Sequence, residues 1–144
     1  MKKFQEYIKE GIVRKRTPNR QRAISLMEES DKKKAFLDIS MKSIPKDKMS
    51  SNFIADYCYD IIMELLRAKM VLEGLNAGNS HEAEVSYMLM LGFTEEDAKT
   101  MDELRYYRNG IKYYGTILDM EYALKALQFM QKVSPRLRML ILET

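Results

Sequence analysis

One long amphipathic stretch, from Ser50 to Leu72, constrains the fold of this chain more than any other. Its apolar residues recur every three or four positions, the spacing of one face of an α-helix. With a serine at position 50 or 51 as N-cap, a helix of about 24 residues reaches roughly 36 Å. This length predicts the central helix of a bundle. The apolar positions are Ile54, Tyr57 or Cys58, Ile61, Leu65, Ala68 and Leu72.

The rest of the chain has the same helical spacing, and no segment alternates apolar and polar residues as a half-buried strand would. We expect N-caps at Thr17, Ser80, Thr94 and Asp119, and a last short helix after Ser134-Pro135. The expected helices are 4–16, 18–43, 50–72, 80–91, 94–115, 119–133 and 135–142. The first is expected to bury Phe4, Tyr7, Ile8 and Ile12, and the second Ile24, Met27, Leu37 and Ile39.

Short connections between long helices make neighbouring helices antiparallel. The predicted fold is therefore all-α, an up-and-down antiparallel bundle of four to five main helices. One domain is expected over residues 1–144, with basic N-terminal helices in 1–49 and the core of the fold in 50–142. The charged run 28–34 is expected to face solvent.

Composition excludes several classes of protein. Hydrophobic residues make up 46% and charged residues 31% of the chain, as in an ordinary globular protein. No apolar run approaches the ~18 residues of a membrane span, and no secretory leader is recognisable, so a cytoplasmic protein is expected. Cys58 is the one cysteine and is expected to be a small buried hydrophobe. Because His81 is the one histidine, no His/Cys zinc site can form, and no cofactor is expected.

The positive charge is concentrated in the first third of the chain. Residues 1–50 carry a net charge of +7 and residues 51–144 a net charge of −4. The densest part is Arg14-Lys15-Arg16, followed by Arg20 and Arg22. Such a cluster is typical of a phosphate contact or, more often, of a solvated helix end and loop. A basic half and an acidic half can also attract each other in a dimer.

The helix expected after Thr94 contains an arginine where its spacing calls for an apolar residue. Met101, Leu104, Ile111 and Leu118 mark one face, and Arg108 lies in the middle of it. A buried arginine is costly unless a partner neutralises it. Two interpretations remain open: a functional anion contact, or a structural ion pair with a carboxylate such as Asp60, Glu64 or Asp102.

Residues 50–142 resemble the HEPN domains, small α-helical proteins of prokaryotic toxin–antitoxin and nucleotide-related systems. The likeness depends above all on Arg108-Asn109 followed by Tyr113. The accompanying segments, in order, are Ala55-Asp56-Tyr57, Leu72-Glu73-Gly74, Ser80-His81-Glu82-Ala83 and Leu104.

The resemblance implies a homodimer in which the arginines of two subunits face one cleft. In family members that are metal-independent ribonucleases, the arginine holds a phosphate and a histidine four to six residues later moves a proton. Here Tyr113 and Tyr114 occupy that window, as in a Tyr-containing subtype, and His81 lies outside it. A tyrosine with a pKa of about 10 is a poor base at neutral pH, although it can still contact phosphate.

The first functional hypothesis is therefore a module that binds nucleotide or RNA phosphates, with a nucleotidyltransferase-type protein partner. Its expected binding residues are Arg105, Arg108, Asn109, Tyr113 and Tyr114. The alternative is a metal-independent endoribonuclease that uses Arg108 with Tyr113, or with His81, in place of the usual histidine. A second alternative is a structural or interaction bundle without a ligand.

Overall fold

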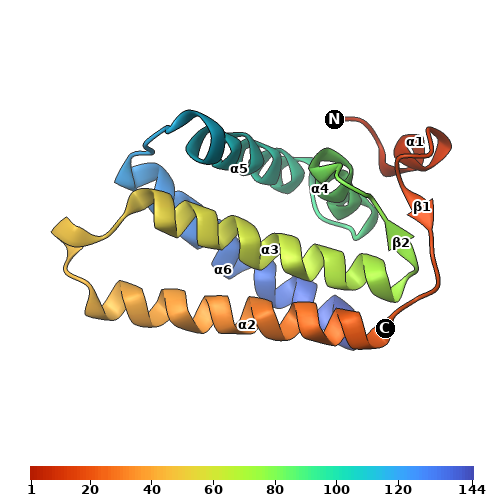
Figure 1. Cartoon of the computed structure of the whole chain (residues 1–144), viewed down its shortest axis with the longest axis horizontal. Helices are drawn as coiled ribbons and strands as arrows, with labels where there is room; N and C mark the ends of the chain where they lie inside the picture. Colours follow the sequence, from red (N-terminus) through yellow and green to blue (C-terminus); the bar gives the residue numbers. More distant parts are fainter.

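Six helices follow one another along the chain in the computed structural model, which describes residues 1–144 (Figure 1). A two-residue antiparallel strand pair and one 3-10 turn, η1, complete the secondary structure. The elements are α1 (Phe4–Lys9), β1 (Arg14–Lys15), α2 (Arg20–Ser43), η1 (Lys46–Lys48), α3 (Ser51–Leu72), β2 (Leu75–Asn76), α4 (His81–Met90), α5 (Glu95–Tyr114) and α6 (Met120–Leu142).

The four long helices α2, α3, α5 and α6 alternate in direction along the chain, so the fold is the predicted all-α, up-and-down bundle (Figure 1). The central member is α3, which packs against α2, α5 and α6. The shorter α4 lies beside α3 and the start of α5, at the end of the molecule that carries β1 and β2 (Figure 1). No helix is both long and apolar enough to cross a membrane.

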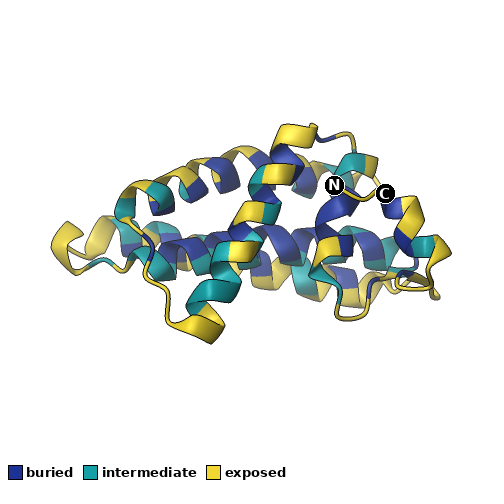
Figure 2. Cartoon of the chain, turned by 90° about the horizontal axis from the view of Figure 1, so that it is seen from above, coloured by how far each residue is buried: buried dark blue, intermediate teal, exposed yellow.

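The core centres on α3, as its spacing predicts. Ile54, Cys58, Ile61 and Ala68 are fully buried, and Leu65 almost so. In Figure 2 the buried positions of the bundle helices face inward, while exposed positions follow the outer surface. Burial raises the pKa of the Cys58 thiol to about 12, which makes it the inert buried side chain expected from the sequence.

Five helices begin at a side chain that accepts a hydrogen bond from the first helical turn, and for α3, α4, α5 and α6 the cap is the residue predicted from the sequence. The cap of α3 is Ser50, and those of α4 and α5 are Ser80 and Thr94. The cap of α6 is Asp119, and α5 ends at Gly115 with φ of 67°, a left-handed conformation suited to glycine. All these boundaries agree with the sequence prediction.

The N-terminal prediction is wrong in its details. The first helix ends at Lys9, and residues 10–13 form a turn that leads into β1. Ile12 is therefore 38% exposed, whereas Val13 is buried. The helix that follows is capped by Asn19 and begins at Arg20, two residues later than the Thr17-Pro18 pair indicated. Strand pairing with residues 75–76 competes with local helix formation here, and sequence spacing does not reveal a distant strand partner.

The buried face of α2 also differs from the prediction. Leu37 is fully buried, but Ile24 and Ile39 are 42% and 62% exposed. A serine takes part instead: Ser30, within the run expected to face solvent, is buried and donates a 2.8 Å hydrogen bond to the Ile61 carbonyl of α3. Because the Ser30 side chain is small and its hydroxyl is hydrogen-bonded, it fits between α2 and α3. The buried face of α2 therefore depends on side-chain size as well as on hydropathy.

The predicted break at Ser134-Pro135 is absent, because α6 continues from Met120 to Leu142 with Pro135 inside it. Val133 and Leu137, on either side of this point, are buried, as is Ile141. Pro135 itself is exposed. A proline in a helix interior costs about 3 kcal/mol or more, because it removes one backbone hydrogen bond and its ring crowds the carbonyl four residues earlier. Burial of the continuous apolar face of α6 offsets this cost.

Candidate functional site

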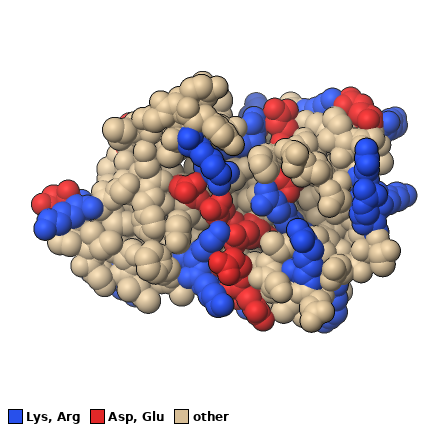
Figure 3. All heavy atoms as spheres, viewed as in Figure 1, with Lys and Arg blue, Asp and Glu red and all other residues tan.

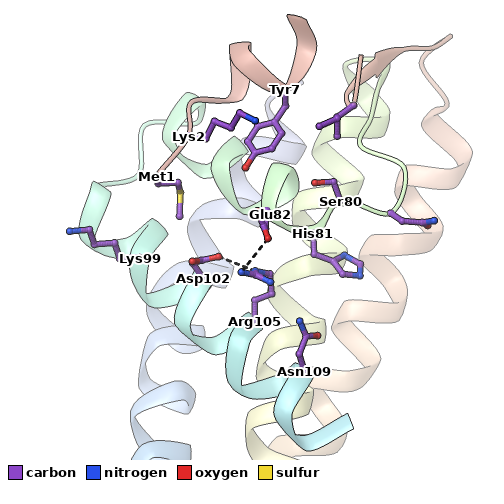
Figure 4. Close-up of a pocket in the computed structure, with 12 residues that line it drawn as sticks. Met1, Lys2, Tyr7, Ser80, His81, Glu82, Lys99, Asp102, Arg105 and Asn109 are labelled. Atoms are coloured by element: carbon purple, nitrogen blue, oxygen red, sulfur yellow. Dashed lines mark hydrogen bonds and ion pairs between the residues drawn. The ribbon is translucent and has the colours of Figure 1, made fainter. Parts of the chain in front are cut away.

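A pocket of about 820 Å³ opens where the N-terminal segment, the start of α4 and residues 99–109 of α5 meet (Figure 4). Its wall is mainly polar and carries more cations than carboxylates. The cations are Lys2, Lys99 and Arg105, the neutral polar residues Asn79, Ser80, His81 and Asn109, and the carboxylates Glu82 and Asp102. Two residues of the arginine helix singled out from the sequence, Arg105 and Asn109, therefore share one cavity.

Arg105 is held in the pocket by carboxylates that remain in contact with water. Its Nε donates to Asp102 Oδ1 at 2.9 Å, and its Nη2 lies 3.8 Å from Glu82 Oε1 (Figure 4). The side chain of Arg105 is 18% exposed, but those of Asp102 and Glu82 are 41% and 63% exposed. Solvent screens such pairs strongly, so they hold the guanidinium only weakly and leave it able to contact a ligand.

A second cluster joins α3 to α4 beside this pocket. Arg67 donates to Glu84 twice, from Nε at 2.6 Å and from Nη2 at 3.1 Å. Burial alone would lower the pKa of Arg67, but the hydrogen bonds and charge of Glu84 outweigh burial and raise it. Glu84 is 4% exposed, so Arg67 neutralises a carboxylate that has left water.

His81 completes this cluster and lies on the border of two pockets. Its Nδ1 is 2.8 Å from Glu84 Oε1 and 3.0 Å from Arg67 Nη2. A proton on Nδ1 that is donated to Glu84 satisfies the carboxylate, whereas an unprotonated Nδ1 would leave two acceptors facing each other. Arg67 Nη2, in contrast, can donate only to an unprotonated Nδ1, so the two contacts of this nitrogen favour opposite tautomers, and both leave Nε2 for other groups. A second pocket, of about 300 Å³, shares His81 and Asn79 with the first.

Arg108 lies between α5 and α3 and does not line the large pocket. Its Nε donates to Asp56 Oδ1 at 3.0 Å and its Nη2 to Asp60 Oδ1 at 3.4 Å. The guanidinium is also 5.0 Å from the centre of the Tyr59 ring. The ion pair with Asp60 was among the sequence alternatives, whereas Asp56, the closer partner, was not. The other two carboxylates considered for Arg108 have different partners: Glu64 binds Lys33, and Asp102 binds Arg105.

Tyr113 and Tyr114 lie at the far end of α5, with 69% and 84% of each residue exposed. Neither lines a pocket with Arg105 or Asn109. The five binding residues expected from the sequence therefore divide into three groups: Arg105 and Asn109 in the pocket, Arg108 against α3, and the two tyrosines on the outer surface. His81 forms its contacts with Arg67 and Glu84 rather than with Arg108.

The lysines of the pocket were not found from the sequence. Lys99 forms no salt bridge, and Lys2 reaches the pocket from the N-terminal segment while bound to Glu10 at 2.7 Å. The packing of α1 against α4 places Lys2, and the packing of α5 against α4 places Lys99; no local pattern reveals either. No group of three or more His, Cys, Asp or Glu side chains is placed to hold a metal ion.

Comparisons with protein-family models, with characterised proteins and with solved structures give no match to this chain.

Proposed function

We propose that this chain is a HEPN-like helical module that binds the phosphate groups of a nucleotide or of RNA, and that the pocket beside Arg105 and Asn109 is the contact site. A guanidinium on a polar pocket wall, with an amide one turn later, suits a phosphate because both groups donate several hydrogen bonds. Lys2 and Lys99 add charge on the same wall. This combination of Arg105 with two lysines in one open cavity is the observation that supports the proposal most.

In this proposal Arg105 and Arg108 have different roles. Three cations and two carboxylates line the pocket, and one of the cations, Lys99, forms no salt bridge. Arg108 is likewise flanked by two carboxylates, Asp56 and Asp60, within 3.4 Å, but it lies between α5 and α3 and does not line this pocket. A phosphate held in the pocket would therefore contact Arg105 rather than Arg108. We therefore assign phosphate contact to Arg105 and Asn109, and attachment of α5 to α3 to Arg108.

Titration calorimetry with ATP tests the proposal. Arg105→Gln removes a charged donor, whose hydrogen bonds contribute about 1.5–3 kcal/mol, so Kd should rise roughly tenfold to a hundredfold. The matched control is Arg138→Gln, because Arg138 also pairs with a carboxylate, Asp31 at 3.1 Å, but does not line the pocket. Equal affinities for the two variants, or an ATP affinity too weak to measure in the unmodified protein, would contradict the proposed site.

A second candidate is a metal-independent endoribonuclease in which His81, rather than Tyr113, moves the proton. The observation that favours it is the buried Glu84 at 2.8 Å from Nδ1, which orients the ring and leaves Nε2 for a substrate at the pocket edge. RNA cleavage in the presence of EDTA tests it. Activity should be lost in His81→Asn and kept in Tyr113→Phe; cleavage that survives His81→Asn excludes this mechanism.

The proposal includes a homodimer, for which the uncharged face of the molecule is the best candidate. In Figure 3 a broad region over the left ends of α2, α3 and α5 carries no Lys, Arg, Asp or Glu. Exposed Phe36, Tyr113, Tyr114 and Ile117 belong to these segments or to the loop that follows α5. Monomers seldom expose large apolar patches. Tyr114→Lys should shift the mass measured by light scattering toward the monomer; an unchanged mass argues against this face.

A nucleotidyltransferase-type partner in a toxin–antitoxin-like system, acting in the cytoplasm, is the remaining part of the proposal. It follows from the HEPN-like pattern of Arg108-Asn109. Co-expression with the product of the neighbouring gene, followed by affinity purification, tests it: a stable complex supports the partner, and separate elution of the two proteins contradicts it.

A further inference from the structure

Three pockets meet at the loop that joins β2 to α4. The large pocket lies on one side of this loop, and the pocket of about 300 Å³ lies on the other, beside Arg22 and Arg67. A third, of about 310 Å³, is lined by the same loop together with Arg14 and Arg16. Asn79 lines all three. The three cavities therefore adjoin the same loop, residues 76–80, and we refer to them together as the depression.

The basic cluster of the N-terminal third is fixed beside this loop by backbone hydrogen bonds. In the strand pair, Arg14 is opposite Asn76, and Arg16 N donates to the Gly74 carbonyl at 2.7 Å. Gly74 has φ of 69°, and a Cβ built there would be 2.3 Å from the Arg16 carbonyl oxygen. Glycine at this position allows the close approach, which places the cluster next to α4 and the pocket of Arg105.

The charge along the depression favours an anion with several negative groups. Seven Lys and Arg side chains line the three pockets against three Asp and Glu side chains, and a fourth carboxylate, Glu10, pairs with Lys2, which leaves a balance of three positive charges. Arg14 and Arg16 donate only to the backbone carbonyls of Gly11 and Lys15, and Arg22 has no carboxylate partner, so these three charges are not neutralised within the chain. In Figure 3, Lys and Arg side chains follow the right-hand edge of the molecule, where β1 and β2 lie.

We propose that this depression binds a single-stranded nucleic acid, with successive phosphates passing from Arg105 over the 76–80 loop to Arg14, Arg16 and Arg22. The inference rests on the proposed phosphate pocket and extends it to a chain of nucleotides. A mononucleotide occupies one pocket only and leaves the other cations unused. A single strand can bend over the loop and direct unpaired bases into separate cavities, whereas a duplex keeps its bases paired inside.

Fluorescence anisotropy with labelled oligouridine of about 3, 6 and 12 nucleotides tests the inference, since single-strand sites span about 4–16 nucleotides. Affinity should rise with length and then level off. In the variant Arg14→Gln/Arg16→Gln/Arg22→Gln the slope of log K against log salt should become less negative by about 2. The loss of affinity between 50 and 200 mM salt should then be about twentyfold smaller than in the unmodified protein. ATP binding in the large pocket should not change in this variant.

The matched control is Lys32→Gln/Lys42→Gln/Lys46→Gln, which removes three charges from residues that line none of the three pockets. Circular dichroism melts establish that both variants are folded. Equal salt slopes for the two variants, or an affinity independent of length while ATP still binds, overturn the inference and leave the proposed function intact. If oligouridine binding depends on Arg14, Arg16 and Arg22 but ATP does not bind, the proposed ATP pocket is contradicted and the contacts of these three arginines are supported. A duplex of equal length should bind more weakly than oligouridine, and a duplex that binds as tightly overturns the proposed single-strand site.

Discussion

The ion pair between α5 and α3 provides the sharpest stability prediction. Arg108 is 17% exposed in its side chain, and its partners Asp56 and Asp60 are 41% and 24% exposed. Breaking a fully buried pair costs about 3–5 kcal/mol, and exposed pairs contribute about 0–1 kcal/mol. Because Asp56 is more than one-third exposed, its share must be reduced for solvent screening, and we place the loss for Arg108→Met at about 1–2 kcal/mol.

Part of that loss comes from the aspartates left behind. Asp56 and Asp60 are four residues apart on α3, where like charges repel by about 0.2–0.5 kcal/mol. Replacing them together with the arginine, as Arg108→Met/Asp56→Ala/Asp60→Ala, should restore stability to within about 1 kcal/mol of the original, since no uncompensated charge remains. Methionine keeps contact with the Tyr59 ring, 5.0 Å from the guanidinium.

Urea denaturation followed by circular dichroism measures both variants, and ATP titration of the folded proteins gives an independent readout. For a chain of this length, 1 kcal/mol corresponds to a shift in Tm of about 2–4 °C. If Arg108→Met is as stable as the unmodified protein, the ion pair of Arg108 with Asp56 and Asp60 does not stabilise the fold. If the folded Arg108→Met protein loses ATP binding while Arg105→Gln keeps it, phosphate contact belongs to Arg108 and our division of roles is wrong.

Three further predictions concern other parts of the fold. Burial alone would raise the pKa of Asp97, but the hydrogen bond from Lys132 outweighs burial, so the pKa is lowered in the folded protein. The variant Asp97→Asn should therefore lose about 1 kcal/mol of unfolding free energy at pH 7. Urea titrations should show that this difference shrinks as the pH falls below about 4. Gly74→Ala should lose more than about 1–2 kcal/mol in the same assay, because alanine at φ of 69° is strained and its Cβ would meet the Arg16 carbonyl. The Cys58 thiol, buried and with its pKa raised to about 12, should react with Ellman's reagent only after unfolding; rapid reaction of the native protein would contradict the burial.

Helix boundaries were predicted best where the signal is local. Ser50, Ser80, Thr94 and Asp119 each bind a backbone N–H three residues later, so the few residues around each cap contain the whole interaction. The apolar spacing of α3 identified the core for the same reason. At Pro135 the local signal for a new helix was overridden by the buried face that α6 presents on both sides of it.

The candidate site was predicted less well. The arginine helix was identified because Arg108 interrupts an apolar pattern, but its partner Asp56 is 52 residues away and cannot be inferred from spacing. Lys33 was assigned to a solvated face, yet it binds Glu64 of α3. Burial lowers and Glu64 raises the pKa of Lys33, with a net rise. Both cases are ion pairs between helices, whose partners are chosen by packing.

The sequence by itself determined the all-α class, the start of four helices, the central position of α3 and the burial of Cys58, because each depends on residues within a few turns of one another. Only the tertiary structure decided that Arg105 shares a pocket with Lys2, that Arg108 is neutralised by Asp56 and Asp60, and that the basic cluster lies against the loop before α4. These last features join segments far apart along the chain. Their energies depend on distance and exposure, and both are defined only once the helices have packed.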